Sequence, residues 1–143
     1  RAGAGSVRGR RVSPVFEWPI RVYYEDTDAG GVVYHARYLH FLERARTEWL
    51  RSIGIDQSRL KRERGLVFVV SRVSLSFRRP ATLDDELLAT CVLVEQRGAS
   101  LRFTQELRKA GSGERLLDAD VLAACVTADS FRPVALPRDL FPE

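Results

Sequence analysis

Residues 23–50 read YYEDTDAGGVVYHARYLHFLERARTEWL, and the expected architecture is built around this stretch. It begins with two closely spaced carboxylates, Asp26 and Asp28. From about Ala36, apolar residues recur every three or four positions, which is the period of one helix face. Gly54 then stands where the C-terminal cap of a helix is usual. The stretch therefore predicts an acidic loop that leads into an amphipathic helix, whose apolar face consists of Tyr38, Leu42, Ala45, Trp49 and Ile53.

The junction between this loop and the helix has the parts of an acyl-transfer site. The first turn of a helix exposes backbone N–H groups without helical acceptors and carries about half a positive elementary charge. Gly30 and Gly31, just before it, let a ligand come close to the backbone. Such N–H groups stabilise an oxyanion, and a carboxylate beside them acts as a general base or a nucleophile. From its position alone, Asp28 also fits a structural role as a loop or helix cap.

Strand patterns surround the loop and the helix. Most of the later strands are joined by short turns, so they pair antiparallel. Between the helix and the second strand, residues 54–65 predict a helical turn capped by Asp56 or Ser58. One long helix and a sheet that buries one apolar face predict an α+β domain, a five-stranded antiparallel sheet wrapped around a long central helix. The predicted strands are residues 17–25, 66–77, 86–96, 101–109 and 115–128.

Size and composition favour one globular domain. The chain has 143 residues, 45% of them hydrophobic and 29% charged, which suffices for one core but not for two ordinary domains. We assign residues 1–15 to a disordered basic tail, because they hold four arginines and no acid, and residues 16–143 to a single domain. Without the tail, acidic and basic residues balance, so we expect no nucleic-acid partner. No apolar run approaches the ~20 residues of a transmembrane helix, and the first residues lack the apolar segment of a secretory signal, so we expect a cytoplasmic protein.

The cysteines and histidines do not predict a metal site. Cys91 and Cys125 lie in apolar strand patterns without C-x-x-C spacing, so we expect buried free thiols. The chain has only two histidines, His35 and His40. We therefore expect neither a metal nor a redox cofactor.

The loop and the helix also resemble a known family. Residues 23–51, YYEDTDAGGVVYHARYLHFLERARTEWLR, are similar to the signature of hotdog-fold acyl-CoA thioesterases of the 4-hydroxybenzoyl-CoA thioesterase type. The similarity is greatest to the bacterial branch associated with the Tol-Pal cell-envelope system, and it extends from Phe16 to about Pro137. It implies a hotdog fold and a hydrolase that splits an acyl-CoA thioester into free acid and thiol. Coenzyme A is then part of the substrate, and no cofactor is implied.

The resemblance also implies roles for individual residues. In this family the second acid of the D-x-D-x-x-G motif acts, so Asp28 is the expected catalytic carboxylate, either attacking the thioester or activating a water. His35 is the second catalytic candidate, through its backbone N–H or its side chain. Glu43 and Glu48 are fallback bases, since other hotdog branches use a helix glutamate, although we interpret this part of the helix, with Arg44 and Arg46, as a solvated or intersubunit charged face. The expected substrate-binding residues are Gly30, Gly31, Val33 and Tyr34, with Ser71 and Ser74 from a strand that the family places at a dimer interface.

Partners and alternative functions complete the expectations. The family implies a homodimer or homotetramer, and acyl carrier protein is a further candidate partner, as an alternative thioester donor. Two other functions stay open. One is a hotdog enoyl-thioester hydratase or dehydratase that uses His35 and a helix glutamate. The other is a non-catalytic module that binds acyl groups or acyl carrier protein.

Overall fold

Five antiparallel strands form one sheet in the computed structural model, which describes residues 14–141. The order across the sheet is β1-β3-β4-β5-β2, so β1 and β2 are its two edges. Every neighbouring pair is antiparallel, as predicted. The strands are β1 (Phe16–Arg21), β2 (Leu66–Phe77), β3 (Glu86–Arg97), β4 (Ser100–Lys109) and β5 (Arg115–Thr127).

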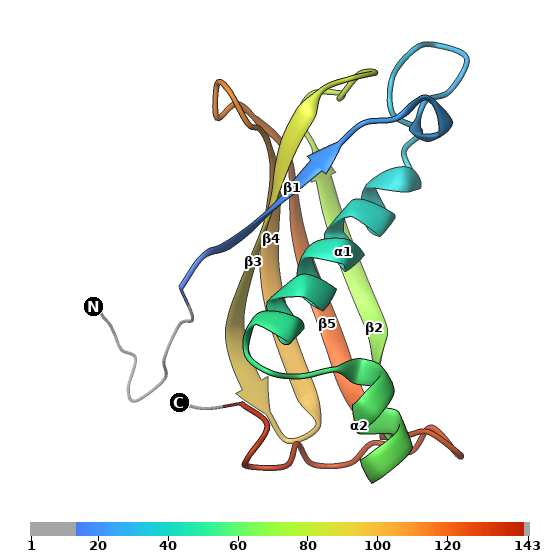
Figure 1. Ribbon diagram of the computed structural model, residues 1–143, viewed down its shortest axis with the longest axis vertical. Coiled ribbons are helices and arrows are strands. Elements are labelled where there is room, and N and C mark those ends of the chain that lie inside the picture. Colours follow the sequence, from blue (N-terminus) through green and yellow to red (C-terminus); the bar gives the residue numbers. More distant parts are fainter. Residues whose placement is uncertain (1–13, 142–143) are drawn as a thin grey trace.

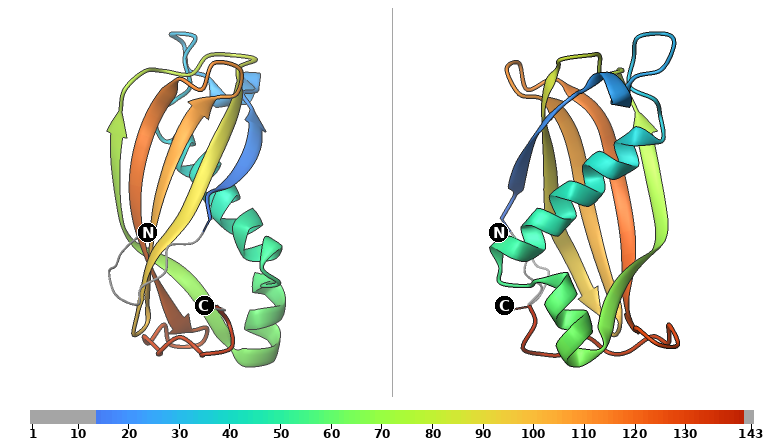
Figure 2. Two further views of the ribbon diagram at one scale, coloured as in Figure 1. Left: turned by 90° about the vertical axis from the view of Figure 1, so that its left-hand side faces the viewer. Right: turned by 45° about the vertical axis from the view of Figure 1, so that its right-hand side comes forward.

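Helix α1 (Arg37–Ser52) crosses one face of this sheet and packs against β1 and β3 (Figures 1 and 2). The predicted apolar face is confirmed, because Tyr38, Leu42, Ala45 and Trp49 are buried and Ile53 packs against the same core. Phe41 and Leu50 widen this buried face. The α+β class and the five-stranded sheet are therefore confirmed.

A second helix, α2 (Gln57–Arg64), follows α1 after a short connection. The Asp56 side chain accepts a hydrogen bond from the Arg59 backbone N–H at 3.1 Å, which identifies Asp56 as the N-cap and rules out the alternative, Ser58. Gly65 ends the helix with a φ of 66°, a left-handed conformation that suits glycine. The predicted helical turn is thus a complete short helix.

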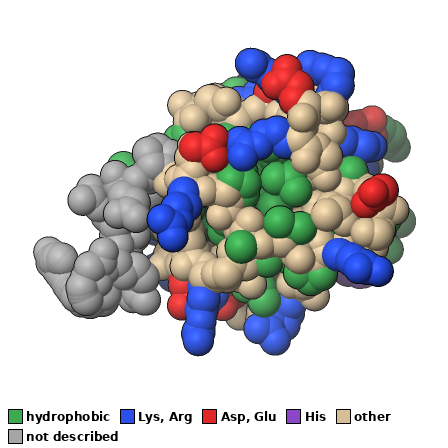
Figure 3. Space-filling view, turned by 90° about the horizontal axis from the view of Figure 1, so that it is seen from below, with side chains coloured by type: hydrophobic (Ala, Val, Ile, Leu, Met, Phe, Trp, Pro, Cys, Tyr) green, Lys and Arg blue, Asp and Glu red, His purple; other side chains and the backbone are tan. Residues whose placement is uncertain are grey.

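The C-terminal segment crosses the same end of the molecule as α2 (Figure 1). Its Phe141 is buried, and the ring stacks on Trp49 of α1 with a centroid separation of 6.1 Å. Seen from below, apolar side chains gather in the middle of the surface, with Lys and Arg side chains around them (Figure 3). Within residues 14–141, neither helix is long and apolar enough to span a membrane.

The first strand is shorter than predicted. Residues 17–25 alternate in a strand-like way, but β1 ends at Arg21, and a short 3₁₀ helix, η1 (Tyr24–Asp26), follows. The backbone turns here because the Tyr23 N–H donates to the Asp26 carboxylate at 2.8 Å. The basic tail predicted for residues 1–15 lies outside the described residues, apart from its last two, which are exposed.

Strand β2 is an apolar edge. Its pairing with β5 shifts register between Val70 and Arg72, where Ser71 forms a bulge. Beyond its pairing with β5, the strand exposes 49% of Val70, 38% of Val73 and 53% of Phe77. An edge strand of 12 residues with apolar side chains on display is a surface suited to pairing with another strand.

Candidate active site

A buried carboxylate anchors the loop between β1 and α1. Asp26 is 2% exposed, and its Oδ1 accepts a hydrogen bond from Arg37 Nε at 2.7 Å. The same guanidinium donates to Glu25 Oε2 at 3.1 Å. The hydrogen bond from Asp26 is the main cause that raises the pKa of Arg37 above its usual value. Asp26 is therefore a structural carboxylate that ties the start of α1 to η1.

Asp28 lies in the exposed part of this loop. Its backbone N–H donates to Val32 O at 2.9 Å, and its carbonyl accepts from the Gly31 N–H at 3.0 Å, so the loop closes into a tight turn. Its Oδ1 accepts a hydrogen bond from the Gly30 N–H at 2.8 Å. Among the described residues, none donates a hydrogen bond to Oδ2. One carboxylate oxygen is thus oriented by the loop, while the other is available to a substrate or a water.

The two glycines of the loop have separate structural reasons. A Cβ at Gly30 would lie 3.2 Å from Asp28 Oδ1, so a larger residue would push against the carboxylate. Gly31 has a φ of 83°, a left-handed conformation that most other residues adopt only with strain. The glycine pair therefore sets the position of Asp28, whatever further role it has toward a ligand.

Helix α1 begins without a side-chain cap. Its N-cap residue is Ala36, and the Arg37 N–H donates to Tyr34 O at 2.8 Å. For the backbone N–H of His35, residues 14–141 offer no acceptor. The His35 ring is exposed and lies against Tyr34, with centroids 4.6 Å apart. The loop therefore holds a free N–H that can donate to an oxyanion and, seven residues earlier, an oriented carboxylate.

The remaining predicted site residues are split between the core and the sheet edge. Val33 is 3% exposed and belongs to the hydrophobic core. Ser71 and Ser74 lie exposed on β2, and Ser71 Oγ donates to Leu122 O at 3.2 Å. The fold therefore brings Asp28, Gly30, Gly31, Tyr34 and His35 together in one loop and places the two serines on a different element.

The loop and the end of β2 are joined through Tyr38. The Ala81 N–H donates to the Tyr38 hydroxyl at 3.0 Å, and the Tyr38 ring meets Phe77 of β2 edge-on, with centroids 5.5 Å apart. Burial is the main cause that raises the pKa of this hydroxyl. The last residues of β2 thus lie beside the first turn of α1.

The charged stretch of α1 agrees with a solvated face only in part, because Glu43 and Arg44 are exposed whereas Arg46 and Glu48 are partly buried. Arg46 is partly buried, lines a cavity between α1 and the sheet, and donates to Gln105 Oε1 at 2.9 Å. Position 46 is four residues after Leu42 and three before Trp49, and this spacing places it beside the apolar face. Gln105 alternates with Phe103 and Leu107 on β4, which predicts an inward direction. Both spacings are visible in the sequence, although the polarity of the two side chains favours a solvated position. Asp28 is not among the residues that line this cavity.

The cysteine prediction is confirmed, since Cys91 and Cys125 are buried and free. In the part of the chain that the structure describes, no three His, Cys, Asp or Glu side chains come together as metal ligands would.

Comparisons with known proteins agree with this fold and loop. A family model described as the thioesterase superfamily matches residues 30–115. The chain is 47% identical over 125 residues to the acyl-CoA thioesterase YbgC of Haemophilus influenzae, covering 87% of this chain and 90% of that one. It is similar to the crystal structure of a probable thioesterase from Bartonella henselae, with a TM-score of 0.80, 35% identity, and coverage of 87% of this chain and 100% of that chain.

A more distant structure has the same fold. A 4-hydroxybenzoyl-CoA thioesterase, solved in complex with 4-hydroxybenzoyl-CoA, aligns with a TM-score of 0.83 at 21% identity and covers 90% of this chain and 96% of that chain.

Proposed function

The chain belongs to the thioesterase superfamily and is an acyl-CoA thioesterase, and from this premise we propose that the loop before α1 carries out the hydrolysis. The observation that carries the proposal is the loop itself, where the Asp28 carboxylate and the free His35 N–H lie seven positions apart around a turn. The relatives' names favour thioester hydrolysis over the hydration of an enoyl thioester and over passive acyl binding.

We assign the catalytic steps to Asp28 and the helix start. Asp28 either takes a proton from a water that adds to the thioester carbon or attacks that carbon directly. In both routes the carbonyl oxygen becomes an oxyanion that accepts a hydrogen bond from the His35 N–H. The carbon–sulfur bond then breaks, and the coenzyme A thiolate leaves and takes up a proton. In the nucleophilic route, water subsequently hydrolyses the mixed anhydride on Asp28.

We propose that substrate binding uses the loop of one protomer and the β2 edge of another. Gly30, Gly31 and Tyr34 surround the reacting thioester, and the buried side chain of Val33 anchors the loop to the hydrophobic core. The exposed apolar edge of β2 supports pairing of two protomers through this strand. In such a homodimer, or a homotetramer built from it, Ser71 and Ser74 lie near the site of the other protomer.

The wider setting is also a proposal. We assign residues 16–143 to one hotdog domain whose sheet wraps around α1 as its long central helix, and residues 1–15 to a basic tail. We further propose that the enzyme works in the cytoplasm in association with the Tol-Pal system, and that acyl carrier protein is a second thioester donor.

Release of free thiol, followed colorimetrically, tests the proposed activity. The wild-type protein is offered short, long, branched and aromatic acyl-CoAs, and we expect thiol release from at least one class. A crotonyl thioester is included because its absorbance reports hydration. Hydration without thiol release, or binding of every thioester without turnover, would overturn the proposed function.

A further inference from the structure

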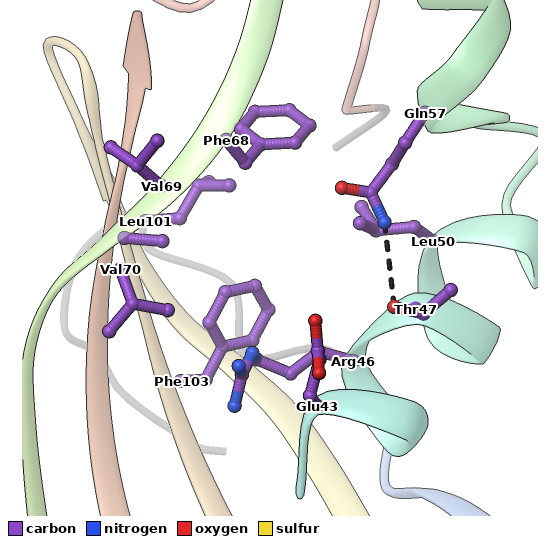
Figure 4. Close-up of a pocket in the computed structure, with 11 residues that line it drawn as sticks. Glu43, Arg46, Thr47, Leu50, Gln57, Phe68, Val69, Val70, Leu101 and Phe103 are labelled. Carbon is purple, nitrogen blue, oxygen red and sulfur yellow. Dashed lines mark hydrogen bonds between the residues drawn. The ribbon is translucent and has the colours of Figure 1, made fainter. Parts of the chain in front are cut away.

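A cavity of about 100 Å³ lies between α1 and the sheet. Phe68 and Val70 of β2, Phe103 of β4 and Leu50 of α1 supply apolar walls (Figure 4). Arg46 extends from α1 into the space between these walls (Figure 4). The cavity therefore has apolar walls, one cation, Arg46, one carboxylate, Glu43, and the polar side chains of Thr47 and Gln57.

Arg46 forms no ion pair with a described carboxylate, although the charge of Glu43 in the same cavity acts to raise its pKa. Within residues 14–141, no Asp or Glu oxygen lies within 4.0 Å of its guanidinium, although Glu43 also lines the cavity. A guanidinium has five N–H donors, and the one hydrogen bond that Arg46 makes to a described residue goes to Gln105 Oε1. Burial is the main cause that lowers the pKa of Arg46. Burial also raises the pKa of the nearby Cys91 thiol to about 12, so this thiol stays neutral.

Gln105 holds Arg46 in place. It is 1% exposed, and its Nε2 donates to Leu42 O at 3.1 Å and to Thr90 O at 3.0 Å. Both carbonyls are acceptors only, so the amide nitrogen must face them and the amide oxygen must face Arg46. Gln105 is a positioning residue that directs the cation into the cavity.

A cation in this place is not explained by the stability of the fold. Arg46 is partly buried and forms no ion pair with a described residue, and taking a charge out of water is costly unless it is paired. The unused donors and the unpaired charge suit an anionic group that enters the cavity with an apolar chain. A carboxylate fits the guanidinium with two parallel hydrogen bonds.

In the homodimer proposed above, the β2 edge connects this cavity to the catalytic loop of the other protomer. The cavity lies beside the first half of β2, at Phe68 and Val70, whereas the other end of β2 lies beside Tyr38 and the start of α1. Two β2 strands that pair antiparallel around a two-fold axis place the first half of one against the second half of the other. The cavity of one protomer then lies next to the loop of its partner, and an acyl chain held at that loop can extend into it.

We propose that Arg46, positioned by Gln105, binds a carboxylate at the far end of the acyl chain. This inference rests on the proposed function and specifies its substrate class. The enzyme prefers CoA thioesters of dicarboxylic acids over those of monocarboxylic acids of the same length. The preference exists only for chains long enough to reach the cavity.

Matched pairs of substrates test this proposal. We compare kcat/KM for butyryl-, octanoyl- and dodecanoyl-CoA with the values for butanedioyl-, octanedioyl- and dodecanedioyl-CoA. For at least one length we expect the wild type to prefer the dicarboxylic thioester by about 10- to 100-fold, the range of a hydrogen bond to a charged group. Arg46→Met removes this preference, and Arg46→Lys keeps part of it, because the charge remains and the planar fork is lost.

Controls separate the possible failures. Arg44→Met changes an exposed neighbour whose guanidinium lies over the Phe41 ring, and we expect the wild-type preference to remain. If Arg46→Met does not fold by circular dichroism, Arg46→Gln replaces it. The inference is overturned if the wild type shows no preference at any length, or if the preference survives without Arg46. In either case, hydrolysis of the monocarboxylic thioesters still upholds the proposed function. If neither these substrates nor the branched and aromatic acyl-CoAs release thiol, both the inference and the proposed function are overturned.

Discussion

Asp26 and Asp28 are two residues apart, yet their surroundings give them different tasks. Asp26 is buried and bonded to the Tyr23 N–H and to Arg37. Asp28 is exposed, and its Oδ2 accepts no hydrogen bond from any residue between 14 and 141. A carboxylate whose lone pairs are already occupied is a poor base, so the chemistry falls to Asp28.

The structural task of Asp26 predicts a loss of stability. Asp26→Ala leaves the Tyr23 N–H and the Arg37 guanidinium without their acceptor, and we expect the free energy of unfolding to fall by about 2–3 kcal/mol. Urea unfolding measures this as a lower midpoint at an unchanged slope. Glu25→Ala is the matched control, because it removes the exposed partner of the same arginine, and exposed ion pairs contribute little. Equal losses in the two variants would contradict a special role for Asp26.

Among the elements, the start of α1 has the most direct role in the proposed chemistry. It has no side-chain cap, and the His35 N–H has no acceptor within the described chain. A helix end that leaves a donor free and exposed is suited to a ligand rather than to the fold. We therefore assign the contribution of His35 to its backbone.

Two substitutions separate the backbone of His35 from its side chain. His35→Pro removes the N–H, and proline is tolerated near a helix start. We expect kcat to fall by ~10²–10³-fold, the cost of one oxyanion donor. His35→Ala keeps the N–H, and we expect kcat to fall by less than ~10-fold. If the alanine variant loses as much activity as the proline variant while both keep the wild-type circular dichroism spectrum, the imidazole is the active group.

The elements that could be predicted from sequence are those with a clear period. The apolar face of α1 and the limits of β2 follow from repeats of three to four and of two residues. The end of β1 could not be predicted in this way, because Tyr23 and Tyr24 favour a strand and the turn depends on a hydrogen bond to Asp26. Periodicity also does not predict which residue forms an ion pair with a given charged side chain. The pairing of Arg37 with Asp26, eleven residues earlier, is visible only in the fold.

Of the candidate site, the sequence predicts only the part that lies in the loop before α1. Asp28, Gly30, Gly31, Tyr34 and His35 are close in sequence, so their proximity in the fold follows from the sequence. The cavity is different, because Arg46, Gln105 and Phe68 come from three elements that meet only after folding. The polarity of Arg46 and Gln105 favours an outward direction, whereas their positions in the periodic pattern indicate the opposite.

In the proposed function, one chain alone does not form the complete active site. Its loop exposes Asp28, its cavity lies elsewhere, and its β2 edge displays Val70, Val73 and Phe77. Antiparallel pairing of two β2 strands covers the apolar edge and brings each cavity to the loop of the other protomer. We therefore expect activity to depend on dimer formation.

A charge on the β2 edge tests this dependence. Val73→Lys places a cation in the proposed interface, and we expect a monomer by light scattering and a loss of most thiol release. Phe131→Lys is the matched control, since Phe131 is 64% exposed in the C-terminal segment, and it should leave the wild-type oligomer and activity. A Val73→Lys protein that stays dimeric, or that is monomeric and fully active, would contradict the shared site.

The turnover number of Asp28→Asn, measured by thiol release at saturating acyl-CoA, is the decisive quantity. The substitution keeps the size of an exposed side chain and an oxygen that can accept the hydrogen bond from the Gly30 N–H, so the fold and the oligomeric state should be those of the wild type. Asp129→Asn, a change at another exposed carboxylate, should leave turnover unchanged. We predict that Asp28→Asn lowers kcat by ~10²–10⁴-fold, whereas a folded variant with near wild-type kcat would contradict a catalytic role for Asp28.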